Sequence, residues 1–488
     1  MTKQAAAPLY EALKKYIAEG NIPFHVPGHK QGIGAPISLK EFLGAGTFCL
    51  DLTEVPGLDD LHHPSGPLKK AQELAAELFK ADDSFLLVNG TTCGLQAGLM
   101  AACGPGDKVL VPRHAHRAVT GALVLSGAVP VYIKPMVDKE YVVPLGVRAE
   151  DMVKVIDAAG PVKAVMMVHP TYHGFVSDLP AITQICHSRG IPVLADEAHG
   201  AHFAFHGELP VTAMNAGVDV TVQSTHKTLG ALTQGSMLHR KGRLISRENI
   251  ARNLRVLLTT SPSYIVMASL DLARRQMAEE GRGLLADVFE MALWTRERIA
   301  GIKGIKCAGM DMTASCGIFG FDLTKILINV SRLGITGYEA AAVLRAEMHI
   351  QVEFADPVNI LLVMSIGTTW DHCRELVVAL EKLAGKYYPT ATAGLARTID
   401  LFDLPLPPLA LTPREAWYAP ASPVRIEAAR DLVSAETVAP YPPGTPVICA
   451  GERITEEVVE LLRYIRDNNI MCQGLADPGK NTIRTVNL

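Results

Sequence analysis

The sequence predicts an α/β fold built on a mostly parallel β-sheet, and three observations indicate it. Between residues 84 and 240, short runs rich in β-branched residues alternate with helical segments. The runs are apolar throughout, as expected for strands that are buried on both faces of a sheet. Several runs end in clusters of polar residues, which is where open α/β sheets bind their ligands.

The predicted strands and helices of this region follow one another in a regular order. A strand at 84–88 precedes a helix at 91–103, and a strand at 108–111 precedes a helix at 116–127. The remaining strands are expected at 128–133, 162–168, 191–195 and 219–223, and the remaining helices at 149–160 and 179–190. Because helices separate most of the strands, most neighbouring strands should run parallel.

Beyond residue 300 the pattern changes to a smaller α+β unit. Strand, helix, strand and helix are expected in that order over 317–385. A proline-rich connector, LFDLPLPPLALTP, then leads to a C-terminal segment with its own turn signal, PYPPG. A chain of 488 residues is too long for one simple core. We therefore expect an N-terminal arm and large domain over 1–300, a small α+β domain over 301–390 and a C-terminal domain over 391–488.

Composition excludes several classes of protein. Hydrophobic residues make up 48% of the chain and the net charge is −4, so a globular fold is expected and a nucleic-acid partner is not. The first twenty residues lack the apolar core of a secretory signal, and the most apolar segment is broken by Gly, Ser and Pro. Nine cysteines contain no C-x-x-C pair. These features predict a cytoplasmic protein with no membrane partner.

Polar clusters follow five of the predicted strands, and we expect them to converge on one crevice. They are NGTT at 89–92, PRHAH at 112–116, HPTYHG at 169–174, DEAHG at 196–200 and STHK at 224–227.

Lys227 is the most unusual residue of these clusters. It follows an apolar run and stands beside His226, and small residues come after it. A lone lysine is most often a solvated surface residue, but this setting favours a desolvated amine. Burial lowers the pKa of a lysine and makes it a better nucleophile toward a carbonyl group, which is what a Schiff base requires.

Asp196 ends the apolar run IPVLA. An aspartate at this place is often a helix cap. It would also suit the protonated nitrogen of a pyridine ring, because an anion there favours the pyridinium form and makes the ring an electron sink. His199 lies close enough in sequence to hold that carboxylate through a hydrogen bond, whereas Glu197 is interpreted as structural.

The segment VNGTTCG combines a tight turn at Gly90, the hydroxyls of Thr91 and Thr92, and the start of a helix. That combination suits a phosphate dianion, although a simple capped helix gives the same pattern. Ser224 would donate a further hydroxyl to the same phosphate.

His114 and His116 follow the strand at 108–111. An imidazole is flat enough to stack on a heteroaromatic ring and also transfers protons, although a pair of loop histidines is the plainer interpretation. The H-x-H pattern has no accompanying carboxylates or cysteines at metal-ligand spacing, so no metal is expected. A Schiff-base lysine, a ring-nitrogen aspartate, a stacking histidine and a phosphate cup together specify pyridoxal 5′-phosphate.

Nine segments spread over nearly the whole chain carry a family resemblance. They are PFHVPGHKQG (23–32), DLTEVPGLDDLHHPSGPLKKAQELAAELF (51–79), LLVNGTTCGLQA (86–97), HPTYHGFVSDL (169–179), LADEAHGAHF (194–203), STHKTLGALTQGSMLH (224–239), LLTTSPSY (257–264), TPREAWYAP (412–420) and VAPYPPGTPVICAGE (438–452). On these segments the chain resembles the Orn/Lys/Arg decarboxylase family, in the compact form that lacks an N-terminal wing domain. The resemblance implies fold type I of the pyridoxal-phosphate enzymes, with an aspartate-aminotransferase-like large domain.

The resemblance also implies a role for each matching residue. Lys227 would bind the cofactor covalently, and Asp196 would contact the ring nitrogen with support from His199. His116 would stack on the ring, and His226 would lie beside it. The phosphate would be held by Gly90, Thr91, Thr92 and Ser224. Similar enzymes build each site across a subunit interface, so Thr260 and Ser261 would reach the phosphate of a neighbouring subunit in a homodimer or higher oligomer. The sequence departs from the family at His114, where asparagine is usual, at Ala118, where serine is usual, and at His173.

The implied activity is decarboxylation of a basic L-amino acid to its amine and carbon dioxide, in polyamine synthesis or amino-acid catabolism. Arginine or lysine is favoured and ornithine remains open, with His226 or Lys227 as proton donor. A carboxylate from Asp51, Glu54, Asp59 or Asp60 would bind the distal cation of the substrate, unless these residues are only a solvated loop. Transamination, β-elimination and a catalytically inactive binding or regulatory protein are the alternatives.

Overall fold

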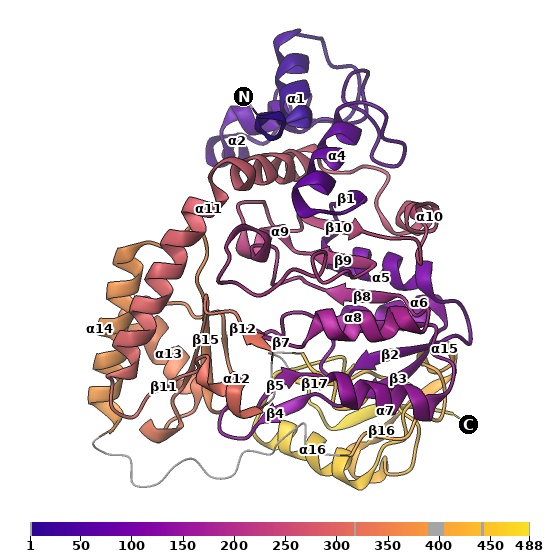
Figure 1. Ribbon diagram of the computed structural model, residues 1–488, viewed down its shortest axis with the longest axis vertical. Coiled ribbons are helices and arrows are strands. Elements are labelled where there is room, and N and C mark those ends of the chain that lie inside the picture. The colour runs from indigo at the N-terminus through magenta and orange to yellow at the C-terminus, as the bar shows by residue number, and fades with distance from the viewer. Residues whose placement is uncertain (1, 317–318, 389–404, 441–443, 488) are drawn as a thin grey trace. The chain divides into compact units, whose positions relative to one another are not determined.

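The computed structural model describes residues 2–316, 319–388, 405–440 and 444–487. Figure 1 draws the path of the chain from the N-terminus to the C-terminus. The structure divides into two compact units. The first comprises residues 1–101 and 194–285, and the second comprises 102–193 and 286–488. The expected domain boundary at 390/391, the start of the proline-rich connector and the central residues of the PYPPG turn lie outside the described residues.

A seven-stranded sheet has the order β1-β10-β9-β8-β6-β2-β3. Its strands are β1 (Asp83–Leu87), β10 (Ser236–Arg240), β9 (Val220–Gln223), β8 (Val193–Asp196), β6 (Ala164–Val168), β2 (Lys108–Pro112) and β3 (Val129–Ile133). Strands β8 and β9 are parallel, and β2 is parallel to both β3 and β6. The predicted mostly parallel sheet is confirmed.

Strand β10 is antiparallel to both of its neighbours, β1 and β9, and was not predicted. The chain returns from β9 to β10 through a connection whose helix, α9 (Thr225–Thr228), is only one turn long. Parallel neighbours are usually joined through a full crossover helix, and this connection has only a single helical turn, which suits an antiparallel return. This short connection contains Lys227.

The first unit has further helices around its strands. They are α1 (Pro8–Ala18), α2 (Ile37–Leu43), α3 (Ala45–Leu50), α4 (Pro67–Phe79), α5 (Gly90–Ala102), α10 (Arg247–Leu257) and the start of α11 (Tyr264–Ala300). Helix α5 packs closely on the sheet because Gly94 and Gly98, which face the strands, have no side chain. A Cβ at Gly94 would lie 2.6 Å from Val222 and 2.7 Å from Leu87, and one at Gly98 would lie 3.2 Å from Val220. The glycines therefore fix the distance between this helix and strands β1 and β9.

The second unit contains the helices predicted around β2, β3 and β6. They are α6 (Arg117–Ser126), α7 (Ala149–Ala159) and α8 (Leu179–Ser188), and the short strands β4 (Met136–Asp138), β5 (Val143–Gly146) and β7 (Phe175–Val176) accompany them. Helix α8 begins where the Asp178 side chain accepts a hydrogen bond from the Ala181 amide. Such a cap satisfies one of the free N–H groups of the first turn.

A four-stranded antiparallel sheet, β11-β13-β15-β14, is the core of the predicted α+β region. Its elements are β11 (Lys306–Cys307), α12 (Asp311–Cys316), β12 (Gly320–Phe321), β13 (Lys325–Asn329), α13 (Gly337–Met348), β14 (Phe354–Ala355), β15 (Asn359–Val363) and α14 (Trp370–Tyr387). The predicted order of strand, helix, strand and helix is present as β13, α13, β15 and α14 (Figure 1). The predicted first strand is broken in two, and β12 pairs with β7 instead of the small sheet.

The C-terminal segment forms its own apolar core around Ile426, Val438, Ile448 and Leu462. Its elements are α15 (Pro413–Tyr418), β16 (Ala421–Arg425), β17 (Ala439–Pro440), α16 (Glu456–Asp467), β18 (Cys472–Gln473) and β19 (Thr482–Val486). Strand β16 pairs with β19 and β17 pairs with β18. Across the described part of the chain, none of the helices combines the length and the apolar character needed to cross a membrane.

Candidate active site

Lys227 lies on α9, directly after the carboxyl end of β9. Its backbone N–H donates to the Ser224 carbonyl at 3.1 Å, which closes the single turn. Its Nζ is 3.1 Å from Nε2 of His199, a residue of the turn that follows the neighbouring parallel strand β8. Two adjacent strand ends therefore place an amine and an imidazole together, as the polar clusters predicted.

The prediction that Lys227 is desolvated is wrong for the single chain, because its side chain is exposed. Helix α9 ends one residue later, and residues 232–234 of the following loop are exposed as well. The small residues after Lys227 thus leave the amine open instead of covering it.

Asp196 is the last residue of β8 and is 6% exposed. Its Oδ1 accepts a hydrogen bond from the Ala198 amide at 3.1 Å. This bond fixes the carboxylate at the same end of the sheet as Lys227. The predicted support of this carboxylate by His199 stays a prediction.

Glu197, next in sequence, is fully buried and belongs to a chain of polar side chains inside the first unit. It accepts hydrogen bonds from the Ala213 amide and from Nε2 of Gln223, each at 2.8 Å. Burial raises the pKa of Glu197 to about 8, although these hydrogen bonds oppose the rise. Gln223 continues the chain by accepting from Nε2 of His239 at 3.2 Å, and Nδ1 of His239 is 2.6 Å from the Ser84 hydroxyl.

Three hydroxyl groups meet at the start of α5. Oγ1 of Thr91 lies 2.6 Å from Oγ of Ser224 and 3.1 Å from Oγ of Ser236. Gly90 has a positive φ of 72°, and its amide donates to the Gln234 carbonyl at 3.1 Å. The N–H groups of the first helical turn have no acceptor within the helix, so they and the hydroxyls could hold an anion.

Ser236 is one of these three hydroxyl residues, and the sequence prediction missed it. It is the first residue of β10, and the antiparallel return of that strand brings it opposite Leu87, close to Thr91. The serine stands in the same segment as Lys227, but without the direction of β10 its position was not predictable. Thr92, which was predicted to bind the same anion, is exposed at this helix start.

His226 precedes Lys227 and is half-buried. Its Nδ1 lies 2.9 Å from the Gly235 carbonyl, so Nδ1 carries the proton and donates it in this hydrogen bond. Desolvation lowers the pKa of His226, the hydrogen bond to Gly235 opposes this, and Lys227 lowers the pKa further. The neutral ring therefore presents Nε2 as its proton-accepting atom.

His116 belongs to the second unit, where it precedes α6. Its Nδ1 accepts a hydrogen bond from the Ala118 amide at 3.2 Å and so caps that helix, while the residue itself is exposed. His114 is buried, and neither of its ring nitrogens has a hydrogen-bond partner among the described residues. Burial lowers the pKa of His114 to about 4.

His173, the other departure from the family pattern, lies in the same unit as His114. Both of its ring nitrogens are buried and likewise lack a hydrogen-bond partner in the described part of the chain. Burial, together with Lys325 and His114, lowers the pKa of His173 to about 3. The two histidines are thus buried, neutral neighbours in the second unit.

Thr260 and Ser261 lie between α10 and α11 in the first unit, and both are exposed. Of the four acidic residues considered for the substrate cation, Asp59 and Asp60 hold turns: Asp59 accepts from the Ser65 and Gly66 amides, and Asp60 accepts from the His62 amide. Oδ2 of Asp51 is 3.1 Å from Nε2 of His29, and Glu54 accepts from the Thr53 hydroxyl at 2.7 Å.

These groups fit the cofactor that the sequence specified. The hydroxyls of Thr91, Ser224 and Ser236 at a helix start suit a phosphate, the buried carboxylate of Asp196 suits a pyridine nitrogen, and the amine of Lys227 suits an aldehyde. They lie at the carboxyl ends of β8 and β9 and at the start of the helix after β1. Fold and site together define a pyridoxal-phosphate enzyme of fold type I.

Comparisons with known proteins agree on the family. Residues 7–372 match the family model described as Orn/Lys/Arg decarboxylase, major domain, and residues 398–477 match its C-terminal domain. The chain is 39% identical to arginine decarboxylase of Bacillus subtilis over 99% of its own length and 98% of the relative's. It is 26% identical to a lysine decarboxylase of Pseudomonas aeruginosa, covering 94% of this chain and 75% of that one.

Solved structures show the same fold. The lysine decarboxylase of Francisella novicida superposes with a TM-score of 0.84 at 24% identity, covering 99% of this chain and 82% of that one. Ureidoglycine–glyoxylate aminotransferase of Bacillus subtilis superposes with a TM-score of 0.52 at 18% identity, over 66% of this chain and 86% of the other. The chain belongs to the Orn/Lys/Arg decarboxylase family. It is a basic amino-acid decarboxylase, a carboxy-lyase that uses pyridoxal 5′-phosphate.

Proposed function

We propose that this enzyme converts L-arginine to agmatine and carbon dioxide. Relatives from Bacillus subtilis, Bacillus anthracis and Halalkalibacterium halodurans that are named arginine decarboxylase are 38–39% identical to it over 99–100% of its length. The lysine decarboxylases it resembles are 25–26% identical. The relatives named arginine decarboxylase thus share more of their sequence with this chain than the lysine decarboxylases do.

The observation that carries the catalytic proposal is the approach of Lys227 Nζ to His199 Nε2 at 3.1 Å, at the ends of two parallel strands. We assign Lys227 as the amine that binds the cofactor and Asp196 as the carboxylate on its ring nitrogen. Gly90, Thr91, Thr92, Ser224 and Ser236 hold the phosphate, and His116 stacks on the ring. When bound, the cofactor supplies an electron sink for the pair of electrons that carbon dioxide leaves behind.

Loss of carbon dioxide from the substrate has to be followed by delivery of one proton to its α-carbon. Lys227 Nζ and His226 Nε2 are the two atoms that we consider. The lowered pKa of His226 leaves its ring neutral near pH 7, with its one proton engaged at Nδ1 by the Gly235 carbonyl. Lys227 Nζ would therefore be the better proton donor.

The distal cation of the substrate requires an anion, and we assign this role to Asp51 or Glu54. Asp59 and Asp60 are less suitable because their oxygens already accept amide hydrogen bonds within turns. A carboxylate that holds a guanidinium through paired hydrogen bonds binds arginine more strongly than it binds the point charge of lysine.

The functional unit that we propose is a homodimer or higher oligomer, with its sites at the subunit interface. Large apolar side chains gather on exposed positions of the N-terminal arm: Ile22, Phe24, Ile33 and Phe42 are each at least 80% exposed. A second copy of the chain would cover this surface. Thr260 and Ser261, which are exposed, would then be available to the phosphate of the neighbouring subunit.

The proposal is tested by incubating the cofactor-loaded enzyme separately with arginine, lysine and ornithine, and measuring carbon dioxide, amine and keto acid. We expect agmatine and carbon dioxide in equal amounts, with the highest kcat/KM for arginine. Cadaverine as the preferred product would overturn the choice of substrate. Keto acid without carbon dioxide would indicate transamination, and a protein that shows no new absorbance band with added cofactor would be a binding or regulatory homologue.

A further inference from the structure

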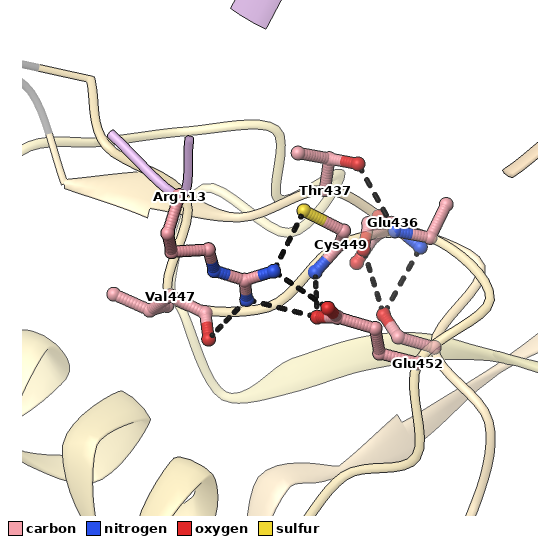
Figure 2. Close-up of polar contacts among 8 residues, drawn as sticks. Arg113, Glu436, Thr437, Val447, Cys449 and Glu452 are labelled. Atoms are coloured by element: carbon pink, nitrogen blue, oxygen red, sulfur yellow. Dashed lines mark hydrogen bonds and ion pairs between the residues drawn. The ribbon is translucent and has the colours of Figure 1, made fainter. Parts of the chain in front are cut away.

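A buried ion pair connects the segment before His116 with the C-terminal part of the chain (Figure 2). The Arg113 guanidinium donates to both carboxylate oxygens of Glu452, with Nη1 2.5 Å from Oε1 and Nη2 2.9 Å from Oε2. Arg113 is 6% exposed and Glu452 is fully buried. A two-point contact of this kind fixes orientation as well as distance.

Other groups complete the surroundings of the guanidinium. Nη2 of Arg113 also donates to the Val447 carbonyl at 3.2 Å, and Nη1 lies 3.3 Å from Sγ of Cys449 (Figure 2). The Tyr132 ring lies 4.9 Å from the guanidinium carbon. The segment 447–452 thus supplies hydrogen-bond acceptors to the N–H donors of the Arg113 guanidinium.

The acceptor side of this contact is held by hydrogen bonds and by a close backbone approach. Oε2 of Glu452 takes the Cys449 amide at 2.7 Å, and the Glu452 carbonyl takes the Ser434 amide at 2.9 Å. Gly451 has a φ of 92°, and a Cβ there would lie 2.1 Å from the Leu411 carbonyl oxygen. Only glycine fits at that position, so the close approach of this backbone to Leu411, next to Glu452, depends on Gly451.

A short backbone turn connects Arg113 to His116. The Arg113 amide donates to the Ile133 carbonyl at 2.8 Å, and the Ala115 amide donates to the Pro112 carbonyl at 2.9 Å. His116 then caps α6 through Nδ1. The short turn is therefore anchored at its beginning by Arg113 and at its end by the helix cap, and His116 stands three residues from the ion pair.

We propose that Glu452 is a positioning residue for the decarboxylase reaction: through Arg113 it fixes the turn that presents His116 to the cofactor. The inference rests on the role of His116 assigned under the proposed function. It makes the C-terminal part of the chain a component of the active-site architecture, although Glu452 itself touches neither substrate nor cofactor.

The charge of Arg113 explains why removal of the Glu452 carboxylate would change the position of the turn. Burial alone lowers the pKa of Arg113, but Cys449 and Glu452 raise it, and the net pKa lies above its ordinary value. The guanidinium consequently keeps its charge at every pH at which the protein is folded. Without Glu452 this buried cation has no matching anion, and the turn has to move to bring it to water.

The test is a double-mutant cycle between Glu452→Gln and His116→Ala in the full-length enzyme. Glu452→Gln should lower kcat about 10- to 100-fold, since a shift of about 1 Å near the reacting atoms has this effect, and should shift the absorbance band of the bound cofactor. KM should change little. In the His116→Ala background, Glu452→Gln should change neither kcat nor the band any further, because the residue through which it acts is gone.

Glu436→Gln is the matched control. Glu436 is a buried carboxylate of the same C-terminal segment, where it accepts the Ala476 amide at 2.8 Å and the Arg484 amide at 2.9 Å. Its loss should lower thermal stability but leave the cofactor band and kcat unchanged. Should Glu452→Gln not fold, Arg113→Lys takes its place in the cycle, because lysine keeps the charge but loses the two-point contact.

Parental kcat and absorbance in Glu452→Gln would overturn the inference, as would full additivity with His116→Ala or an equal effect of Glu436→Gln. If His116→Ala alone changes neither kcat nor the band, the role of His116 falls, and this inference falls with it. The decarboxylase assignment would then still stand on the measured products of the three substrates.

Discussion

Two buried polar arrangements, one in each unit, satisfy their side chains in different ways. In the first unit, Ser84, His239, Gln223 and Glu197 form a chain of hydrogen bonds between groups that are neutral in the interior. In the second unit, Arg113 and Glu452 form a charged pair. Both arrangements satisfy buried polar atoms. In the first arrangement, burial raises the pKa of Glu197 to about 8 and lowers the pKa of His239 to about 3.

The difference predicts how protonation should affect the first arrangement and how removal of one partner should affect the second. The neutral chain is sensitive to acid, because protonation of His239 would place a charge in a site that lacks an anion for it. The charged pair is sensitive to removal of one partner, because a single buried charge is then left without its counterion. The predictions below probe this contrast, from the largest expected effect to the smallest.

Lys227→Ala should reduce decarboxylation by several orders of magnitude, because the first unit then lacks the amine that we assign to the cofactor. The measurement is carbon dioxide release under saturating arginine. Lys70→Ala, which removes an exposed lysine of α4 in the same unit, is the control and should retain parental turnover. Substantial turnover in Lys227→Ala would contradict the assignment of this amine.

Arg113→Met should lower the free energy of unfolding by about 3–5 kcal/mol, since it leaves Glu452 buried without a cation. Combining it with Glu452→Leu should restore most of that stability, because two apolar side chains need no counterion. Urea denaturation of the parent, both single variants and the double variant measures the effect. A double variant that is as unstable as the sum of the two singles would show that the pair does not act as a unit.

Asp196→Ala should reduce kcat about 100- to 1,000-fold, which is the usual effect of removing one electrostatic partner of a reacting group. Asp271→Asn provides the comparison, since Asp271 is a buried carboxylate of the same unit that accepts the Leu9 amide at 3.0 Å and pairs with Arg274. Its loss should reduce stability without a selective loss of kcat. Equal kcat in the parent and Asp196→Ala would exclude a role on the cofactor ring.

His239→Gln should reduce the sensitivity of the protein to acid. Burial lowers the pKa of His239 to about 3, so the folded state keeps this ring neutral while the unfolded state protonates it near pH 6.5. The stability from this difference is complete above pH 6.5 and is lost as the pH falls toward 3, by about 1.4 kcal/mol per pH unit.

The parent should therefore lose about 2 kcal/mol more than His239→Gln between pH 7 and pH 5. Urea denaturation at the two pH values gives this difference. His187→Gln, which changes an exposed histidine at the end of α8, should behave like the parent. If His239→Gln loses as much stability as the parent, His239 is not the source of the acid sensitivity.

The same contrast shows what the sequence alone could predict. Strand and helix order was predictable because apolar runs and helical periodicity are local signals. The convergence of Lys227 with His199 was predictable because both follow strands of one sheet. The contact between Ser84 and His239 depends on the antiparallel pairing of β1 with β10, in which these residues are direct partners. That pairing was not predicted, since a strand alone does not reveal its direction.

Long-range features were beyond the sequence prediction for the same reason. Arg113 and Glu452 are separated by 339 positions, and no local pattern connects them. The solvent exposure of Lys227 was predicted wrongly, because small residues after a lysine were taken to cover it when they form an open loop. Local chemistry was therefore predictable, whereas burial and distant partners depend on tertiary structure.

The central claim is that Lys227 is the amine that holds the cofactor, and borohydride reduction followed by peptide mapping tests it most directly. The enzyme is loaded with pyridoxal 5′-phosphate, reduced and digested, and the modified peptide is identified by mass. The account predicts a single modified residue, Lys227, and no modification in Lys227→Ala. Modification of another lysine, such as the fully buried Lys325, or of none, would contradict it.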